Sequence, residues 1–196
     1  MYPYNHKMGQ KIQTDAPGVA LDRAFLAHML IVAALALAAS NTGVHTAVAL
    51  TAEAQDVTTE ITNPAVPRNL IVKGNAEGIA GDVVIEGTNI AGEEITETIA
   101  LDGATAVEGA KAFKTVTKIT LPAETHEGTD TVSVGWGDKL GLPYKLAHNT
   151  VLAVFLDGAK EGTAPTVAVS KTALESNTVD LNSALNGKDV DIYLIV

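Results

Sequence analysis

Between Asn63 and Leu146 the chain alternates short apolar, β-branched runs with Gly-rich turns. The runs are Ile71–Lys73, Asp82–Thr88, Glu94–Leu101, Phe113–Leu121 and Asp130–Gly135. Strands this short, separated at such regular intervals by turn residues, predict a mainly β fold. We expect an antiparallel β-sandwich or small barrel of the Ig-like or jelly-roll type.

Several runs also show which face of each strand is buried. Val132, Val134 and Trp136 alternate with polar or small residues, which predicts a half-buried strand. Val151–Leu156 is apolar on both faces, so we expect it in a central position. The run from Val190 to Val196 predicts a last strand that must be paired or covered.

Ala20–Ser40 is rich in Ala and Leu and predicts the one apolar helix of the chain. Such a helix could be buried against the sheet, lie in a subunit interface, or enter a membrane. Asp15 and Asp22 argue against a signal peptide. The apolar run Met29–Ala39 is shorter than the ~20 residues that a membrane span needs.

The prolines Pro64 and Pro67 suggest a boundary between two parts of the chain. Residues 1–62 would form an N-terminal extended arm, the apolar helix and linking segments, and residues 63–196 the β body. Two of the linking segments, 44–50 and 57–62, fit either strands or a helical turn. Met1–Pro17 is polar and punctuated by Gly and Pro, which is typical of an arm that is disordered in isolation or lies across a neighbour.

The composition narrows the classes of function. A formal net charge of −10 with a pI near 4.8 argues against binding to a nucleic-acid backbone. The chain has no cysteine, which excludes disulfides, thiolate zinc sites and a cysteine nucleophile. With 46% hydrophobic residues in 196, it is long and apolar enough to form a substantial core.

Possible reactive motifs lack the required spacing. The sequence GWGDKLG at 135–141 does not fit a phosphate-binding loop, and we interpret it as a turn with Trp136 packed inward. No two histidines have zinc-ligand spacing, and no calcium loop occurs in the acidic clusters around Glu94 and Glu124. Serines lack a nucleophile elbow. We therefore predict no catalytic, cofactor-binding or metal-binding residues, and no enzymatic activity.

Five blocks of sequence resemble, in order, segments of tailed-bacteriophage virion proteins, in particular head decoration (cement, or auxiliary capsid) proteins. The blocks are NPAVPRNLIVKGN (63–75), GTNIAGEEITETIALDG (87–103), KAFKTVTKITLP (111–122), VGWGDKLGLPY (134–144) and DLNSALNG (180–187). The resemblance covers roughly residues 44–196. It implies a structural role in the virion and brings no catalytic residue with it.

Together these observations predict a decoration protein on the outer capsid surface, present in the host cytoplasm during assembly. Its partners would be the major capsid protein and copies of itself, for example as trimers, with no nucleic acid and no membrane. Tyr2, Tyr4 and Phe25 are the residues expected at interfaces. The alternatives are a neck, tail or fibre component with an adhesive surface, and a secreted or cell-surface β module anchored through Ala20–Ser40.

Overall fold

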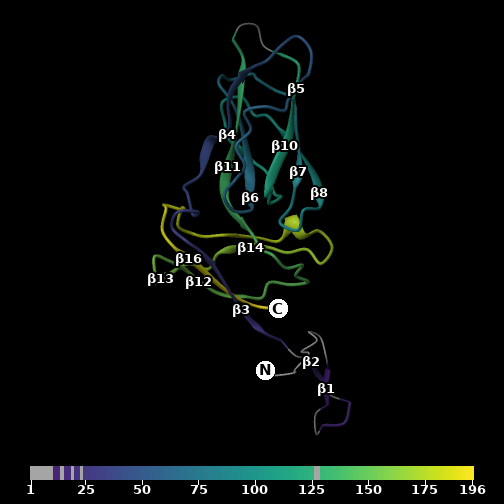
Figure 1. Cartoon of the computed structure of the whole chain (residues 1–196), viewed down its shortest axis with the longest axis vertical. Coiled ribbons are helices and arrows are strands. Elements are labelled where there is room, and N and C mark those ends of the chain that lie inside the picture. The colour runs from purple at the N-terminus through teal and green to yellow at the C-terminus, as the bar shows by residue number, and fades with distance from the viewer. Residues whose placement is uncertain (1–10, 14–15, 19, 23, 126–128) are drawn as a thin grey trace.

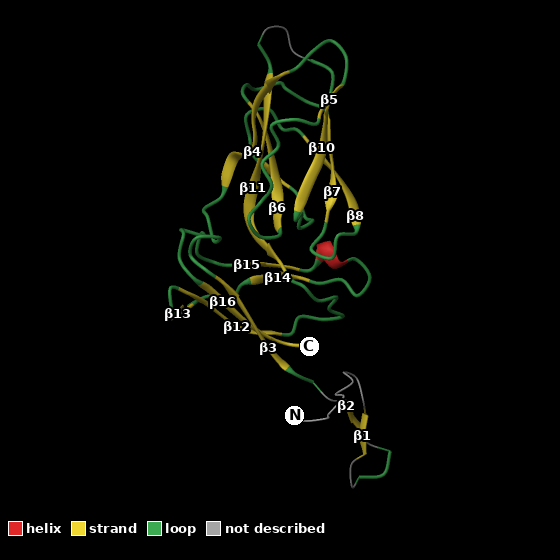
Figure 2. Cartoon of the chain, viewed as in Figure 1, coloured by secondary structure: helices red, strands yellow, loops and turns green. Residues whose placement is uncertain are grey.

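The computed structural model describes residues 11–13, 16–18, 20–22, 24–125 and 129–196, and it is mainly β with antiparallel strands (Figure 1). The helical structure in these residues is one 3-10 turn, η1 (Leu174–Ser176), which Figure 2 shows in red. The prediction of a mainly β protein is therefore confirmed. Strands dominate because the predicted runs are rich in β-branched residues, as in β7 (Asp82–Thr88), where Val83 and Ile85 are buried.

Two sheets make up the upper part of the molecule in Figure 1, and the second of them also extends into the lower part. One contains, in order, β5 (Gln55–Val57), β10 (Thr115–Leu121), β7 and β8 (Glu94–Ala100). The other contains, in order, β14 (Thr166–Ala168), β15 (Thr178–Asp180), β11 (Thr131–Gly141), β6 (Arg68–Gly74) and β9 (Val107–Glu108), and β4 (Ser40–Ala49) also pairs with β11.

A third sheet lies below these two in the same view. Its order is β13 (Ala159–Lys160), β12 (Val151–Leu156), β16 (Val190–Ile195) and β3 (Leu26–Ile31). The last strand of the chain is thus paired on both sides, as predicted. A separate hairpin of β1 (Lys11–Gln13) and β2 (Ala20–Asp22) pairs with itself and lies beyond the third sheet in Figure 1.

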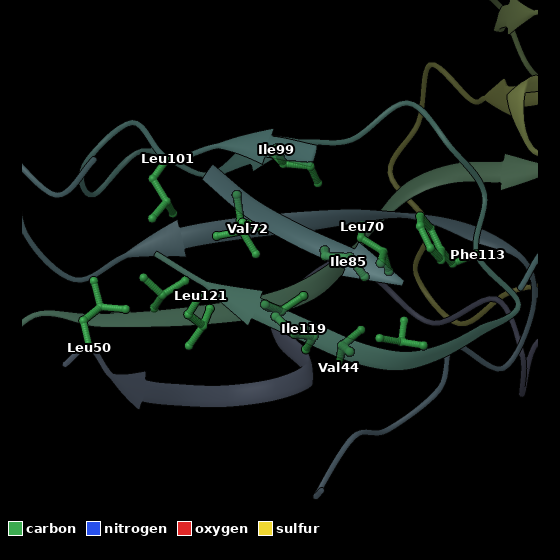
Figure 3. Close-up of a cluster of buried hydrophobic side chains, with 14 of the residues drawn as sticks. Val44, Leu50, Leu70, Val72, Ile85, Ile99, Leu101, Phe113, Ile119 and Leu121 are labelled. Carbon is green, nitrogen blue, oxygen red and sulfur yellow. The ribbon is translucent and has the colours of Figure 1, made fainter. Parts of the chain in front are cut away.

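Two clusters of buried side chains hold the sheets together. The first joins the two upper sheets and includes Leu70, Ile85, Phe113 and Ile119 (Figure 3). The second joins the third sheet to the lower end of β11 and includes Leu140, Val179 and Ile192. Most members of both clusters are aliphatic, because the chain has few aromatic residues.

Strand β11 connects the two clusters. Val132 and Val134, near its start, belong to the first cluster, and Leu140, near its end, belongs to the second. The strand pairs with β4 and β6 along its first part and with β15 at Leu140 and Gly141. The sequence GWGDKLG therefore lies within this strand, and the prediction of a turn there was wrong. Gly135 is required because a Cβ would clash with the backbone of Ser40 on β4.

The predicted apolar helix over Ala20–Ser40 was also wrong. The described part of this segment forms β2, β3 and a turn at 33–35, followed by the start of β4. Pairing with β16 overrides the helix propensity of Ala and Leu, because β16 offers a complete ladder of partners from Val190 to Ile195. Side chains of β3 alternate between the second cluster and solvent: Ile31 is buried, and Leu30 is 51% exposed.

The boundary proposed near residue 62 stays a prediction. Within the part assigned to the arm, β3, β4 and β5 pair with strands of the 63–196 part, namely β16, β11 and β10. Strand β4 covers most of 44–50, so a strand is the correct alternative there. In 57–62 only Val57 belongs to a strand, β5, and residues 58–62 form neither a strand nor a helical turn.

Candidate functional site

The most unusual surface of the molecule is a run of exposed apolar side chains from Leu26 to Leu37, which we call the apolar segment. It begins on β3 and continues through the turn that follows. Its large exposed members are Leu26, Leu30, Val32, Leu35 and Leu37. Leu26 is 62% exposed, which is more than any other large hydrophobic residue with a described side chain. Grouped apolar side chains in water mark a contact surface rather than a solvated one.

The outer face of the third sheet carries an aromatic row beside this segment. The rings of His28 and Tyr193 stack with centroids 4.5 Å apart and an interplanar angle of 5°. Phe155 meets Tyr193 edge-on at 5.8 Å. The three residues come from β3, β16 and β12, which are adjacent strands. His28 Nε2 also lies 2.7 Å from Asp191 Oδ1, which fixes the orientation of the imidazole.

A hollow of about 690 Å³ opens next to the start of β3. Its walls are mostly apolar and include Tyr144, Leu146 and Leu174. Glu93 on its wall accepts a hydrogen bond of 2.8 Å from Asn89 Nδ2, so this carboxylate is already engaged. Phe25, one of the predicted contact residues, lies at the edge of the sheet near this hollow. Its N–H and C=O exchange hydrogen bonds of 2.9 Å with Val196.

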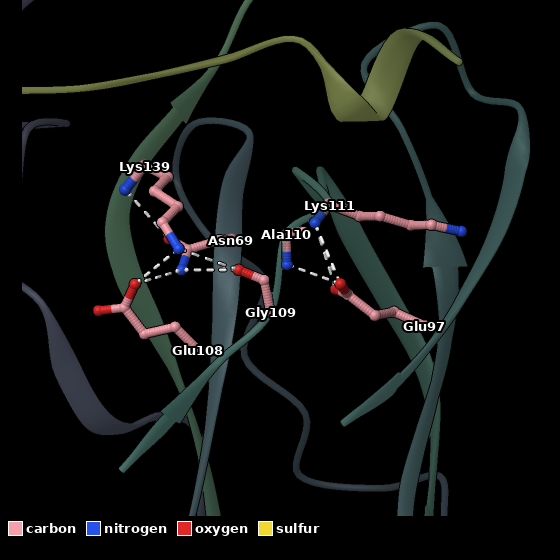
Figure 4. A network of polar contacts seen from close by, with 7 residues as sticks. All are labelled: Asn69, Glu97, Glu108, Gly109, Ala110, Lys111 and Lys139. Atoms are coloured by element: carbon pink, nitrogen blue, oxygen red, sulfur yellow. Dashed lines mark hydrogen bonds and ion pairs between the residues drawn. The ribbon is translucent and has the colours of Figure 1, made fainter. Parts of the chain in front are cut away.

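Polar side chains gather at the level between the two clusters (Figure 4). Lys139 Nζ lies 2.9 Å from Glu108 Oε2, and the backbone N–H of Lys139 donates to Asn69 Oδ1 at 3.0 Å. Asn69 is buried and donates to the carbonyl of Gly109 at 3.3 Å. These contacts tie β6, β9 and β11 together, so this network is structural.

Glu97 is a polar residue that the sequence places between Ile95 and Ile99, and its contacts explain its presence there. Its carboxylate accepts hydrogen bonds from the backbone N–H groups of Ala110 at 2.6 Å and Lys111 at 3.2 Å (Figure 4). Burial raises the pKa of Glu97 above its ordinary value, and the two backbone donors oppose that effect. The side chain therefore anchors the 109–111 loop to β8.

Arg68 forms a buried ion pair that sequence reasoning missed. Its Nη2 lies 3.1 Å from Asp138 Oδ1, and Nη1 donates to the carbonyl of Leu37 at 2.7 Å. Burial lowers the pKa of Arg68 to about 10, partly offset by Asp138. Burial also raises the pKa of Asp138, against the effect of Arg68. The only indication of this ion pair in the sequence is a charged residue in an otherwise apolar strand.

The remaining predicted residues have separate roles. Tyr2 and Tyr4 lie outside the described residues, and Phe25 is half-buried at the sheet edge. The glutamates of the cluster around Glu94 do not converge, since Glu93 contacts Asn89 and Glu97 contacts the backbone. No group of three or more His, Cys, Asp or Glu side chains suited to a metal ion occurs among the residues described. Within those residues, no helix has the length and apolarity needed to span a membrane.

Comparisons of this chain with protein-family models, with curated proteins and with solved structures found no match.

Proposed function

We propose that this chain is a structural protein of a tailed-phage virion, of the head decoration class, which binds the outside of the head and stabilises the seams between coat subunits. The observation that carries the proposal is the apolar segment 26–37, which presents five large aliphatic side chains to solvent on a rigid β body. Such a surface gains free energy when a partner covers it.

The proposed mechanism depends on buried area rather than on chemistry. Burying apolar surface contributes about 25 cal/mol per Å², and only part of that appears as affinity because docking orders both partners. The contribution is repeated at every copy around a shell. Small increments at each seam then add up to a large effect on the whole particle.

Charge and resemblance support the same proposal. A chain of net charge −10 fits a position outside the shell, away from packaged DNA. The blocks that resemble phage virion proteins supply β6, β8, β10 and much of β11, which contribute many residues to the first cluster. The resemblance thus involves the strands that build the body. We propose further that the two upper sheets, which share this cluster, form a β-sandwich of the Ig-like or jelly-roll type.

The proposal is tested by binding the purified protein to phage heads that lack it. The wild-type protein should sediment with the heads and raise the temperature at which they release DNA. Leu37→Ser should weaken this binding, because Leu37 is 43% exposed within the apolar segment. The matched control is Ile90→Ser, since Ile90 is 40% exposed in the turn between β7 and β8, outside the apolar segment. A wild-type protein that neither binds such heads nor occurs in purified virions would overturn the proposal.

One observation favours a second candidate, a neck, tail or fibre component with an adhesive surface. The aromatic row formed by His28, Tyr193 and Phe155 offers ring faces of the kind that stack on sugars. Imaging of virions that carry a label on the C-terminus distinguishes the two candidates. Label over the whole head supports decoration, and label confined to the tail or neck supports the second candidate.

A further inference from the structure

The geometry points to a specific contact between two copies of this chain: we propose that β3 pairs with β3 of a second copy, antiparallel and about a two-fold axis at His28. The contact would join the third sheets of two molecules into one continuous sheet. This inference does not depend on the proposed function, because it concerns the purified protein in the absence of any particle.

The hydrogen bonds of the third sheet show which backbone groups of β3 are unused. Phe25 and Val196 exchange both of their backbone hydrogen bonds, so they form a hydrogen-bonded pair. The register continues without a shift from Leu26 opposite Ile195 to Ile31 opposite Val190. Hydrogen-bonded pairs alternate along an antiparallel ladder. The N–H and C=O groups of Leu26, His28 and Leu30 therefore point away from β16.

No other described strand pairs with β3, which is the last strand of its sheet. Figures 1 and 2 show it at the margin of the lower part of the molecule. Natural edge strands usually avoid pairing through a charge, a proline, a bulge or a short length. Strand β3 has six residues, no proline, no shift in register, and no Asp, Glu, Lys or Arg. It thus lacks the common features that prevent edge-to-edge association.

The absence of charged residues on β3 permits a second copy as the partner. The chain has a net charge of −10, so two copies repel each other over most of their surfaces. Residues 24–40 add no repulsion of this kind, because this stretch contains no Asp, Glu, Lys or Arg. Its one titratable side chain, His28, faces Asp191 of its own sheet and stacks on Tyr193. Two copies can approach each other here without opposing like charges on β3.

The sequence of β3 is also self-complementary. Antiparallel pairing about His28 places Leu26 of each copy opposite Leu30 of the other. These two leucines are 62% and 51% exposed, so pairing would remove part of both from water. The small residue Ala27 would face Met29 of the other copy on the inner side. Backbone groups supply the affinity, and the leucine pairs fix the register.

A cysteine cross-link tests the register directly, because the natural chain contains no cysteine. In the proposed pairing, residue 28 lies opposite residue 28 of the other copy, at a separation that a disulfide can bridge. His28→Cys should therefore give a covalent dimer on mild oxidation. Leu26→Cys is the matched control, because residue 26 is also exposed on β3 but would lie opposite residue 30 of the other copy. It should not cross-link, because the two copies of residue 26 would be about four residues apart along the strand.

Solution measurements provide the second test. Sedimentation equilibrium of the wild-type chain should show a concentration-dependent dimer. Leu30→Lys should raise the dimer dissociation constant by about tenfold or more, which corresponds to losing about 1.4 kcal/mol. Leu152→Lys places the same charge on a leucine that is 58% exposed in the same sheet but on β12, and it should leave the dimer unchanged. Far-UV circular dichroism shows whether each variant is folded.

Three results would overturn the proposal. The first is a wild-type chain that stays monomeric at all concentrations tested. The second is equal cross-linking of the Leu26→Cys and His28→Cys variants, which would indicate contact without this register. The third is an equal effect of Leu152→Lys and Leu30→Lys, which would indicate face-to-face contact. A dimer with the predicted register that does not bind phage heads would support this inference while contradicting the proposed function.

Discussion

The guanidinium of Arg68 lies 3.1 Å from the carboxylate of Asp138, although the two residues are 70 positions apart in the chain. Arg68 is 2% exposed and Asp138 is 25% exposed. The pair connects β6 to β11. Arg68 Nη1 also donates a hydrogen bond of 2.7 Å to the carbonyl of Leu37. Arg68 thus attaches the C-terminal end of the apolar segment, at Leu37, to the β body.

We expect Arg68→Leu to destabilise the folded chain by about 3 kcal/mol, because it leaves the partly buried Asp138 without its cation. Urea unfolding followed by circular dichroism measures this change. The matched control is Lys188→Met, which breaks an exposed ion pair to Asp157 at 3.5 Å. That change should cost less than about 1 kcal/mol. Similar costs for both variants would show that burial does not strengthen the role of Arg68.

The packing of Trp136 on Gly43 gives a second prediction. A Cβ at residue 43 would lie 2.7 Å from the indole ring, whose Nε1 donates to the carbonyl of Ala38 at 3.1 Å. Gly43→Ala should therefore displace the ring, cost about 1–3 kcal/mol and change the fluorescence of this sole tryptophan. Gly162→Ala is the control, because nothing lies within 4 Å of a Cβ there. An unchanged emission spectrum in Gly43→Ala would contradict the described packing.

Glu97 gives a prediction about pH. Burial raises its pKa above the ordinary 4.5, so the folded chain holds this proton more tightly than the unfolded chain does. The resulting stabilisation is complete below the ordinary value and is lost as pH rises through the folded-state pKa. Lowering the pH from 7 toward 4.5 should thus increase the free energy of unfolding.

Substitution isolates the contribution of this carboxyl group. Glu97→Gln should reduce the gain in stability between pH 7 and pH 5, measured by urea unfolding at each pH. Glu94→Gln removes the same formal charge from the exposed start of β8, and the gain should persist in that variant. Asp138 and Asp180 also have raised pKa values, chiefly because of burial, so part of the gain should survive in Glu97→Gln. An identical pH dependence in wild type and Glu97→Gln would contradict the burial of this carboxyl group.

Asn177 gives a fourth prediction. It is fully buried, and its Oδ1 accepts hydrogen bonds from the backbone N–H groups of Leu146 and Ser170 at 3.0 and 2.8 Å. Its Nδ2 donates to the carbonyl of Ala173 at 2.8 Å. Asn177→Ala leaves these groups buried without partners and should cost about 3 kcal/mol.

The control for Asn177 is Asn149→Ala, since Asn149 is exposed and accepts one local hydrogen bond from Val151. It should cost less than about 1 kcal/mol in the same thermal or urea unfolding measurement. Equal costs would mean that the Asn177 contacts contribute no more than a surface turn does.

The sequence allowed strands to be predicted where short apolar or β-branched runs are separated by turn residues. Asp82–Thr88 and Val151–Leu156 were predicted with the bounds that the structure shows. The segment that became β3 was mistaken for a helix because its exposed positions, Leu26 and Leu30, are as apolar as its buried ones. The pattern of period two was therefore hidden, and only the distant strand β16 reveals it.

The polar contacts at the level between the clusters could not be predicted in the same way. Arg68 and Asn69 lie on β6, Glu108 on β9 and Asp138 on β11, and no local pattern links the three strands. Their pairing depends on the register of β6 against β11, which includes a shift between Trp136 and Leu140. Register of this kind depends on packing between strands that are far apart in the sequence. A local sequence pattern therefore does not predict it.

The continuous course of β11 through both clusters has a mechanical consequence. A hinge would let the two ends of the molecule swing apart under load, whereas here one covalent backbone passes from one end to the other and is flanked by β4 and β6 for much of its length. Tension applied at the apolar segment would be carried along that strand as shear between paired neighbours. We expect the molecule to resist such tension as one rigid unit, and to unfold at both ends in a single step.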